Sequence, residues 1–306
     1  MRHKIITYFR AGNANNKRTE NKQAKGTFRS AGMKSYTNIL GIFIVGLWLL
    51  TSCGDYGKVL KGADYQQKRT MALDLYEKEK YKKALPLWEE LFGIIRGSST
   101  AEETHWYLAS TYFNVGDMLL ANYYYSLFVK NFPKSSRREE AMYMSAFSLY
   151  KASPRYTLDQ TASLEAIQSF QSFVDMYPES ARLAEANRLV DELLAKLERK
   201  MLNQAHLHYV RQEYRAAITT WETVLQDFPD TEKRFEIYFQ IIKASFEFAD
   251  LSIKQRKWER FSDVIDYYRT FAVRLKGSPY ESEAKSLMLK AEEQKVLAPK
   301  PNDEDV

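Results

Sequence analysis

The sequence predicts an all-α protein in which helical hairpins stack into a solenoid. Apolar residues recur every three or four positions over long stretches, most clearly over residues 183–205. Alternating β-branched runs bounded by tight turns, which would predict strands, are absent. An aromatic–proline pair also recurs along the chain at intervals that suit one helical hairpin each.

The recurring stops have the form aromatic, proline, any residue, hydroxyl side chain. They are Phe132-Pro133-Lys134-Ser135, Tyr177-Pro178-Glu179-Ser180 and Phe228-Pro229-Asp230-Thr231, with a weaker relative at residues 277–280. Proline pushes the residue before it out of the α region, so each pair ends a helix. The Ser or Thr that follows can cap the next helix.

The residues before each stop follow the tetratricopeptide pattern of small and aromatic positions. The matching positions are Leu108, Ala109, Tyr112, Gly116, Ala121 and Tyr125 before Pro133; Ala166 and Phe170 before Pro178; Ala205, Tyr214, Ala217 and Trp221 before Pro229; and Ala72, Tyr81, Ala84, Trp88 and Leu91 in a first copy without proline. A fifth copy, around residues 258–275, is degenerate and has Phe261 where alanine is expected. The four matching copies and the degenerate one predict about five hairpins. We expect these hairpins to stack, because no single one can bury its apolar face alone.

Charge separates a leader from the rest of the chain. The whole chain carries 45 Lys and Arg against 39 Asp and Glu. Residues 1–52 hold nine of the bases and one acid, Glu20, so residues 53–306 are left with 36 bases and 38 acids. The part expected to fold has no basic excess for phosphates, so nothing indicates nucleic-acid binding.

The leader predicts a lipid anchor at Cys53. Residues 39–50 form an apolar run of 12 residues, too short for a membrane span of about 20 residues but typical of a signal peptide. Lys34 supplies the positive charge before the run, and Leu50-Thr51-Ser52-Cys53 resembles a lipobox. A short buried helix with an incidental cysteine is the alternative. We interpret residues 33–52 as the signal peptide and 1–32 as an overlong start or an extended n-region.

The rest of the chain divides by these signals. Residues 53–64 are expected to be the lipidated cysteine with a linker, 65–178 the N-terminal repeats 1–3, and 181–295 the C-terminal repeats 4–5 with a capping helix. Residues 296–306, rich in proline and acids, are expected to be a disordered tail.

No constellation in the sequence predicts catalysis, a cofactor or a metal. His206 and His208 stand two apart, so on a helix they face different sides and cannot share a metal, and His208 suits a packing role in a hairpin. Gly-rich phosphate loops and Gly-x-Ser-x-Gly elbows are absent. The sequence therefore indicates a binding protein rather than an enzyme.

Two groups of residues are candidates for binding. Most of the dense aromatics of repeats 2 and 3 must be core, but Trp106, Tyr107 and Tyr143 lie where the first helix of a repeat could offer an aromatic floor to a peptide. The second group lies in the loop at 153–161, which interrupts a repeat: Pro154, Arg155, Tyr156, Asp159 and Gln160. That loop is either a recognition element or a plain connection in which Asp159 or Thr161 caps the next helix.

Several of these features together resemble one family, the outer-membrane assembly lipoproteins of the BamD type. The resemblance covers about residues 53–290. It depends on the lipobox, on the Phe132-Pro133 and Tyr177-Pro178 stops, and on further local matches: Tyr76-Glu77 with Tyr81, Ala84 and Leu85; the loop Pro154-Arg155 with Asp159-Gln160-Thr161; and Ala186-Asn187 in a long helix.

The resemblance implies a non-enzymatic subunit of the β-barrel assembly machinery, held by its lipid on the periplasmic face of the outer membrane. It implies that residues 65–178 receive the aromatic-ended C-terminal signal of unfolded outer-membrane proteins. It implies that residues 181–295 dock on the periplasmic domains of the barrel subunit. A SusD-type nutrient-binding lipoprotein and a pilotin or cell-division repeat lipoprotein are the alternatives.

Overall fold

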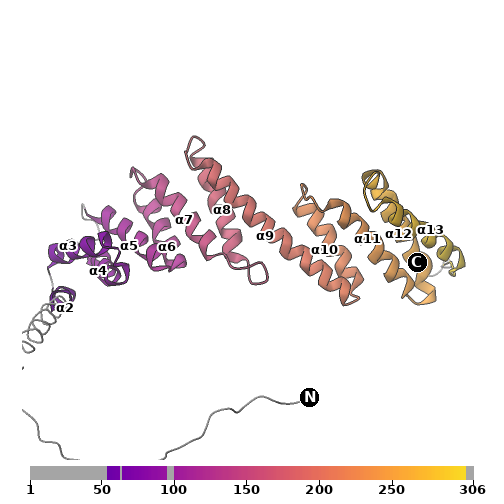
Figure 1. The fold of residues 1–306 in the computed structure, drawn as a ribbon, viewed down its shortest axis with the longest axis horizontal. Helices are drawn as coiled ribbons and strands as arrows, with labels where there is room; N and C mark the ends of the chain where they lie inside the picture. Colours follow the sequence, from indigo (N-terminus) through magenta and orange to yellow (C-terminus); the bar gives the residue numbers. More distant parts are fainter. Residues whose placement is uncertain (1–53, 63, 95–99, 301–306) are drawn as a thin grey trace, which may run out of the picture. The chain divides into compact units, whose positions relative to one another are not determined.

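The computed structural model describes residues 54–62, 64–94 and 100–300, and every regular element in these ranges is an α-helix (Figure 1). Cys53, the leader and residues 301–306 lie outside the described residues. The chain divides after Lys58 into two compact units, and the second, Val59–Val306, carries all the repeats. A helix, α2 (Gly54–Lys61), occupies most of the expected linker.

Five helix pairs and one further helix follow one another in the second unit. They are α3 (Tyr65–Glu77) with α4 (Tyr81–Ile94), α5 (Ala101–Val115) with α6 (Met118–Asn131), α7 (Arg138–Ala152) with α8 (Thr161–Met176), α9 (Leu183–Val210) with α10 (Tyr214–Asp227), α11 (Arg234–Asp250) with α12 (Lys254–Leu275), and α13 (Glu281–Leu297). We call the first helix of each pair helix A and the second helix B. Each helix from α3 to α13 packs against the next along the chain, which confirms the all-α tetratricopeptide solenoid.

The helix α13 closes the array where a sixth helix A would stand, because it packs against both α12 and α11. It ends at Leu297, two residues inside the segment that we expected to be tail.

The small residues of the repeat pattern lie where helices cross. They have no exposed surface: Ala72, Ala84, Ala109, Ala121, Ala166, Ala205 and Ala217. The aromatic partners Trp88, Tyr125, Phe170 and Trp221 are buried beside them. Phe261 takes the place of the helix B alanine in the fifth pair and is also fully buried, so the degenerate copy keeps the register with a larger side chain.

The hydroxyl of each stop ties the loop to the repeat that has just ended. The side-chain oxygen donates a hydrogen bond to a glutamate on helix A of that repeat: Ser135 to Glu102 at 2.7 Å, Ser180 to Glu139 at 2.6 Å, and Thr231 to Glu198 at 2.5 Å. We call each of these bonds a staple. The three staples place every stop loop above the first helix of its own hairpin.

The same hydroxyls accept backbone hydrogen bonds, but not in the way that we expected. Ser135, Ser180 and Thr231 each accept the N–H of the residue two positions on, at 3.0–3.1 Å. Those residues are Arg137, Arg182 and Lys233, which stand just before the helix rather than in its first turn. The hydroxyl therefore shapes the turn into the helix instead of capping the helix itself.

The long helix α9 joins two parts of the core. Its first turns pack against α8 and α7, and it also packs against α10. Leu193 and Ala205 are buried, whereas no residue between them is. One apolar cluster thus includes Ala205 and continues to Ala291, and the clusters around Tyr143 and Leu149 end at Leu189 and Leu193.

Candidate functional site

Tyr107 on α5 lies among aromatic rings of α3 and α4. Its half-buried ring stacks on Trp88, with 5.0 Å between centroids and 8° between planes, and it meets the edge of Tyr76 at 4.9 Å. Burial raises the pKa of Tyr107 above its usual value, and the charge of Arg137 acts against that shift. The phenol therefore remains a hydrogen-bond donor over the physiological pH range.

Trp106, the neighbour of Tyr107, is half-buried against α6. Its ring meets Tyr125 at 5.6 Å and Phe128 at 5.7 Å. The guanidinium carbon of Arg137 lies 5.1 Å from the centroid of the Trp106 ring, and the Arg137 side chain is exposed. An aromatic face and a positive charge therefore share one site, an arrangement that suits an aromatic side chain next to a carboxylate.

The expectation for Tyr143 has to be corrected, because its side chain is 2% exposed. Its ring packs against Phe170 and Phe173 at 5.9 and 5.6 Å, and the Arg182 guanidinium covers it at 4.5 Å. Burial and a hydrogen bond to Glu185 raise the pKa of Tyr143 to about 12. Tyr143 is thus a core residue and cannot offer its face to a peptide.

The helix A face of the first two repeats is braced by polar links between α3 and α5. Arg69 binds both carboxylate oxygens of Glu103 at 2.6–2.8 Å. The hydroxyls of Tyr76 and Ser110 are 2.5 Å apart. These links hold α3 against α5 beside the Trp106 and Tyr107 rings, so the aromatic surface has a fixed shape.

In the 153–161 loop, Gln160 points inward and holds the loop together. Its Nε2 donates to the carbonyls of Arg155 and Leu158 at 3.0 and 3.1 Å, and its Oε1 accepts from Ser163 at 2.7 Å. Its side chain is buried. Gln160 is therefore a structural residue, which corrects its assignment to recognition.

Asp159 lies just before α8, whose N-cap residue is Gln160 without a side-chain cap, so neither Asp159 nor Thr161 is the cap that a plain connection was expected to have. The Asp159 Oδ1 accepts the backbone N–H of Thr161 at 2.9 Å, the first residue of α8. Hydrogen bonds from Thr161 hold the pKa of Asp159 below its usual value. This carboxylate is ionised at neutral pH and already engaged at the helix start.

The loop is also tied to the long helix α9. Lys196 donates to Ser153 at 2.5 Å and Lys200 to the carbonyl of Leu158 at 2.7 Å. The Arg199 guanidinium lies 4.5 Å from the ring centroid of Tyr156. Of the residues expected to recognise a partner, Arg155 is exposed, whereas Pro154 and Tyr156 are half-buried.

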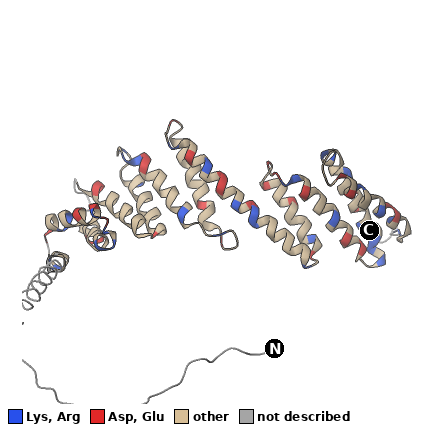
Figure 2. Ribbon diagram, in the orientation of Figure 1, with Lys and Arg blue, Asp and Glu red and all other residues tan. Residues whose placement is uncertain are grey.

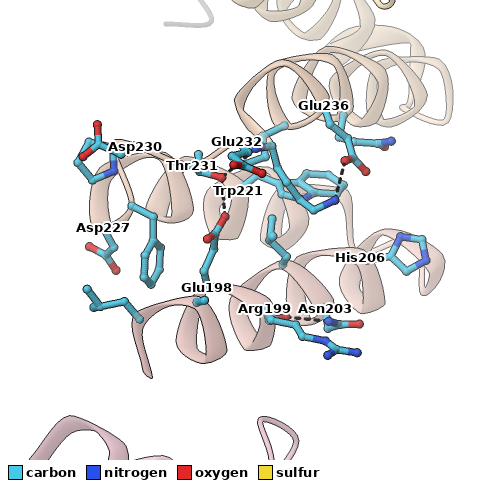
Figure 3. A pocket seen from close by; sticks show the side chains of 18 of the residues that line it. Glu198, Arg199, Asn203, His206, Trp221, Asp227, Asp230, Thr231, Glu232 and Glu236 are labelled. Atoms are coloured by element: carbon cyan, nitrogen blue, oxygen red, sulfur yellow. Dashed lines mark hydrogen bonds and ion pairs between the residues drawn. The ribbon is translucent and has the colours of Figure 1, made fainter. Parts of the chain in front are cut away.

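A hollow lies between α9, the stop at 228–231 and α11, with a volume of about 1020 Å³ (Figure 3). We call it the α9–α11 cleft. Its apolar surface comes from Leu194, Leu202, Trp221, Phe228 and Ile237. Figure 3 shows Glu198 reaching from α9 to its staple with Thr231, while Asp227 and Asp230 stand at one end and His206 at the other.

Acidic side chains dominate the α9–α11 cleft. The carboxylates are Asp191, Glu198, Asp227, Asp230, Glu232 and Glu236, and the cationic side chains are Arg199 and Lys233. Lys233 lies 3.4 Å from Glu236 and is partly neutralised there. The excess of negative charge over an apolar floor favours a basic, partly apolar segment of a protein partner.

Sequence reasoning missed this cleft, because its residues come from separate helices and have no motif of their own. The one signal was the acidic run after Phe228-Pro229, where Asp230 and Glu232 flank Thr231. His206 lines the cleft, while His208 meets Glu213 at 2.6 Å across the α9–α10 turn. Within the described ranges, no group of His, Asp and Glu side chains could hold a metal ion.

Comparison with known proteins gives one family. A family model named YfiO and described as an outer membrane lipoprotein matches residues 64–260. No curated protein sequence matches the chain significantly. Among solved structures, the TPR2AB-domain:pHSP90-complex of yeast Sti1 aligns over 74% of this chain and 98% of that one, at 10% identity and a TM-score of 0.36. That likeness is too weak to support an argument.

Proposed function

Because the chain belongs to the YfiO family of outer membrane lipoproteins, the BamD type, we propose that it serves the β-barrel assembly machinery as a periplasm-facing, non-enzymatic scaffold. The observation that supports this most is the family match, which covers the repeats from Asp64 to Arg260. It favours this role over the nutrient-binding, pilotin and cell-division alternatives. None of the described helices is long and apolar enough to cross a membrane.

Cys53 is the expected membrane anchor. Two or three acyl chains on one residue hold a protein stably at a bilayer, whereas one chain does not. The Cys53→Ala chain should therefore leave the membrane fraction when its protein partners are removed. Continued sedimentation with membranes under those conditions would exclude Cys53 as the anchor.

We propose the α9–α11 cleft as the docking site for the periplasmic domains of the barrel subunit. Its carboxylates at the 228–231 stop face the solvent at Asp227 and Asp230, and Glu232 follows directly. An acidic rim over Leu194 and Phe228 suits a basic loop with an apolar residue at its centre. The cleft lies within residues 181–295, the half that the resemblance assigns to docking.

The test reverses charge at one stop and uses the neighbouring stop as a control. Asp230→Lys should weaken capture of the purified periplasmic domains of the barrel subunit, because it places a cation opposite the basic partner. Glu179→Lys is the matched control, since Glu179 holds the same position in the Tyr177-Pro178 stop and does not line the cleft. Equal binding by both variants would remove the cleft from the interface.

We propose the surface of Trp106, Tyr107 and Arg137 as the site for the C-terminal segment of unfolded outer-membrane proteins. The aromatic faces would stack on the terminal aromatic residue, and Arg137 would pair with the free carboxylate. An aromatic contact contributes about 0.5–1.5 kcal/mol beyond burial, so Trp106→Ala should weaken binding about threefold to tenfold.

A synthetic C-terminal peptide separates the two contributions. Amidation of its carboxyl group should weaken binding to the parent chain but not to Arg137→Ala, because only the parent has the pairing cation. Lys134→Ala, an exposed base on the same stop, is the control and should behave like the parent. If amidation weakens peptide binding equally in the parent, Arg137→Ala and Lys134→Ala chains, Arg137 does not pair with the carboxylate of the peptide.

A further inference from the structure

Exposed aliphatic side chains gather on one edge of the repeat array. We define the turn edge as the side on which helix A passes to helix B, at about residues 78–80, 116–117, 153–160, 211–213 and 251–253. Figure 1 shows the 153–160 loop and the stops before α9 and α11 on opposite sides of the row of helices. The turn edge is therefore the side away from the stapled stops.

The exposure at this edge is large and recurs at four of the five turns, all except the turn at 78–80. Leu207 and Val210 at the α9–α10 turn are 53% and 62% exposed, and Leu251 and Ile253 at the α11–α12 turn are 66% and 67% exposed. Leu119 after the α5–α6 turn and Leu158 in the 153–160 loop continue the row. Single exposed leucines are ordinary, but a row of them over successive turns marks an interaction surface.

A hollow of about 820 Å³ connects two members of this row. It lies between the α5–α6 turn and the 153–160 loop and is lined by Leu119, Pro154 and Leu158, with Lys151 and Asp159 among its polar residues. The loop that forms one wall is held by Lys196 and Lys200 from α9. The apolar wall therefore stays at the edge instead of folding over the helices.

Basic side chains accompany the aliphatic ones. Bases outnumber acids around the turns at 77–83, 151–161, 208–215 and 250–257, with Lys254, Arg256 and Lys257 at the last of them. At the stops, acids outnumber bases over 175–185 and 226–236. Figure 2 shows acidic and basic segments side by side along the stop side of the array. The stop at 131–141 is an exception with three bases against two acids, and the turn at 116–117 carries only Asp117, so the contrast in charge holds for four turns and two stops.

We propose that the turn edge lies against a lipid bilayer that contains anionic headgroups. Aliphatic side chains on protruding turns can enter the acyl boundary of the bilayer, while the long stems of Lys and Arg bring their charges to the phosphates. Membership of an outer membrane lipoprotein family supports a place for the chain beside a bilayer. The proposal does not depend on the partners assigned above.

A bilayer fits this edge better than a protein partner does. The exposed residues at its turns are Leu, Val and Ile, whereas the centres of protein interfaces are enriched in Trp, Tyr, Met and Arg. They lie in the turns or in the helix ends beside them; Leu119 and Leu158 share a hollow, and the others belong to separate turns. A row of aliphatic side chains with basic neighbours is the pattern of interfacial membrane binding.

The experiment uses the full lipidated chain in vesicles of phosphatidylcholine with phosphatidylglycerol. Leu251→Cys carries an environment-sensitive dye at the turn edge, and Val273→Cys, a still more exposed aliphatic position near the end of helix B on the stop side, is the matched control. The parent chain, treated with the same dye, gives the background from Cys53. A quencher attached to the lipid acyl chains reports contact.

We expect the dye at position 251 to be quenched and the dye at 273 to stay in water. Adding Lys254→Gln to the Leu251→Cys chain should weaken the bilayer contact about fivefold, because a base near an anionic surface contributes about 1 kcal/mol. Arg256 is already paired with Glu259 at 2.9 Å and is left unchanged. Equal quenching at both positions, or none at 251, would overturn the proposal. An absence of quenching at position 251 would favour a protein partner for the turn edge.

Discussion

At the scale of single residues, the stop hydroxyls have two functions that one atom can perform together. Ser180 donates its proton to Glu139 and accepts the N–H of Arg182 with its lone pair. The oxygen thus links helix A of one repeat to the first helix of the next. A hydroxyl side chain is the smallest group that can both donate and accept at this position.

Replacing Ser180 by Ala should lower the free energy of unfolding by about 1 kcal/mol, because both hydrogen bonds of the hydroxyl are lost. Ser172→Ala is the matched control, since the Ser172 hydroxyl donates only to the Gln168 carbonyl of its own helix. Urea denaturation of the two variants measures the difference. A loss no larger for Ser180→Ala than for Ser172→Ala would show that the staple does not stabilise the repeat junction.

His105 should make stability depend on pH. It is buried between Phe92 and Phe132, and burial holds its pKa below the usual value, against the opposing effect of its hydrogen bond to the Ala101 carbonyl. The unfolded chain binds a proton at about pH 6.5, the folded chain only at lower pH. Stability should therefore fall as the pH drops below about 6.5, by at most about 1.4 kcal/mol per unit, until the folded histidine is protonated too.

Urea unfolding between pH 7.5 and 5 tests this dependence. His105→Phe keeps an aromatic ring and removes the titrating group, so its stability should change less over that range than that of the parent chain. His206→Phe is the control, because His206 is exposed. If His105→Phe shows the same pH dependence as the parent, another group is responsible.

At the scale of elements, helix ends depend on backbone conformation that only some residues adopt easily. Gly116 follows α5 with φ of +96°, and its N–H bonds back to the Tyr112 and Phe113 carbonyls. Asp117 then caps α6 through the N–H of Leu120 at 3.1 Å. Two adjacent residues therefore end one helix and begin the next.

Gly116→Ala and Gly93→Ala should change stability in opposite directions. A Cβ would meet nothing within 4 Å at either position, so sterics do not decide the outcome. Alanine at Gly116 would have to adopt a left-handed backbone, which costs about 1 kcal/mol. Gly93 is helical, and alanine there should add about 0.5 kcal/mol. Thermal unfolding shows whether each substitution raises or lowers the stability. If both variants were destabilised, the expected gain from Gly93→Ala would be wrong.

Helix pairing could be predicted from the sequence because it depends on local signals. Proline stops and the alanines at crossing positions act over a few residues, and structure and register agree at Ala109 and Phe170. The burial of Tyr143 could not be predicted, because it depends on distant residues: Phe170 and Phe173 of α8, and Arg182 from beyond the next stop, pack around its ring. The α9–α11 cleft was missed for the same reason, since two helices separated by α10 form its walls.

At the scale of the whole repeat unit, the core is not continuous. The apolar cluster from Ala205 to Ala291 is separate from those that end at Leu189 and Leu193, and half-buried or exposed residues of α9 lie between them. Stacked repeats contact only their neighbours, so a weak junction limits how far a local loss of structure spreads. The two parts should therefore open separately.

Phe261→Ala should destabilise the C-terminal cluster alone. Removing a fully buried phenylalanine costs about 3–5 kcal/mol. Hydrogen exchange should speed up over residues 205–291 and remain as in the parent chain over α5 to α8. Phe170→Ala, fully buried in the other cluster, should give the reverse pattern. If either variant lost protection from hydrogen exchange over both clusters, the repeats would unfold as one cooperative unit.

The uninterrupted helix α9 also fixes how far the repeats after it are rotated relative to the repeats before it. One residue added within its 28 would advance everything after it by about 1.5 Å and rotate it by about 100°. Seven added residues would lengthen the helix by about 10 Å yet return the rotation to within about 20°. The angle between the surfaces before and after α9 thus depends on the number of residues in this helix. An insertion in α9 should let the surfaces before and after it keep working together only if its length is close to a whole number of helical turns.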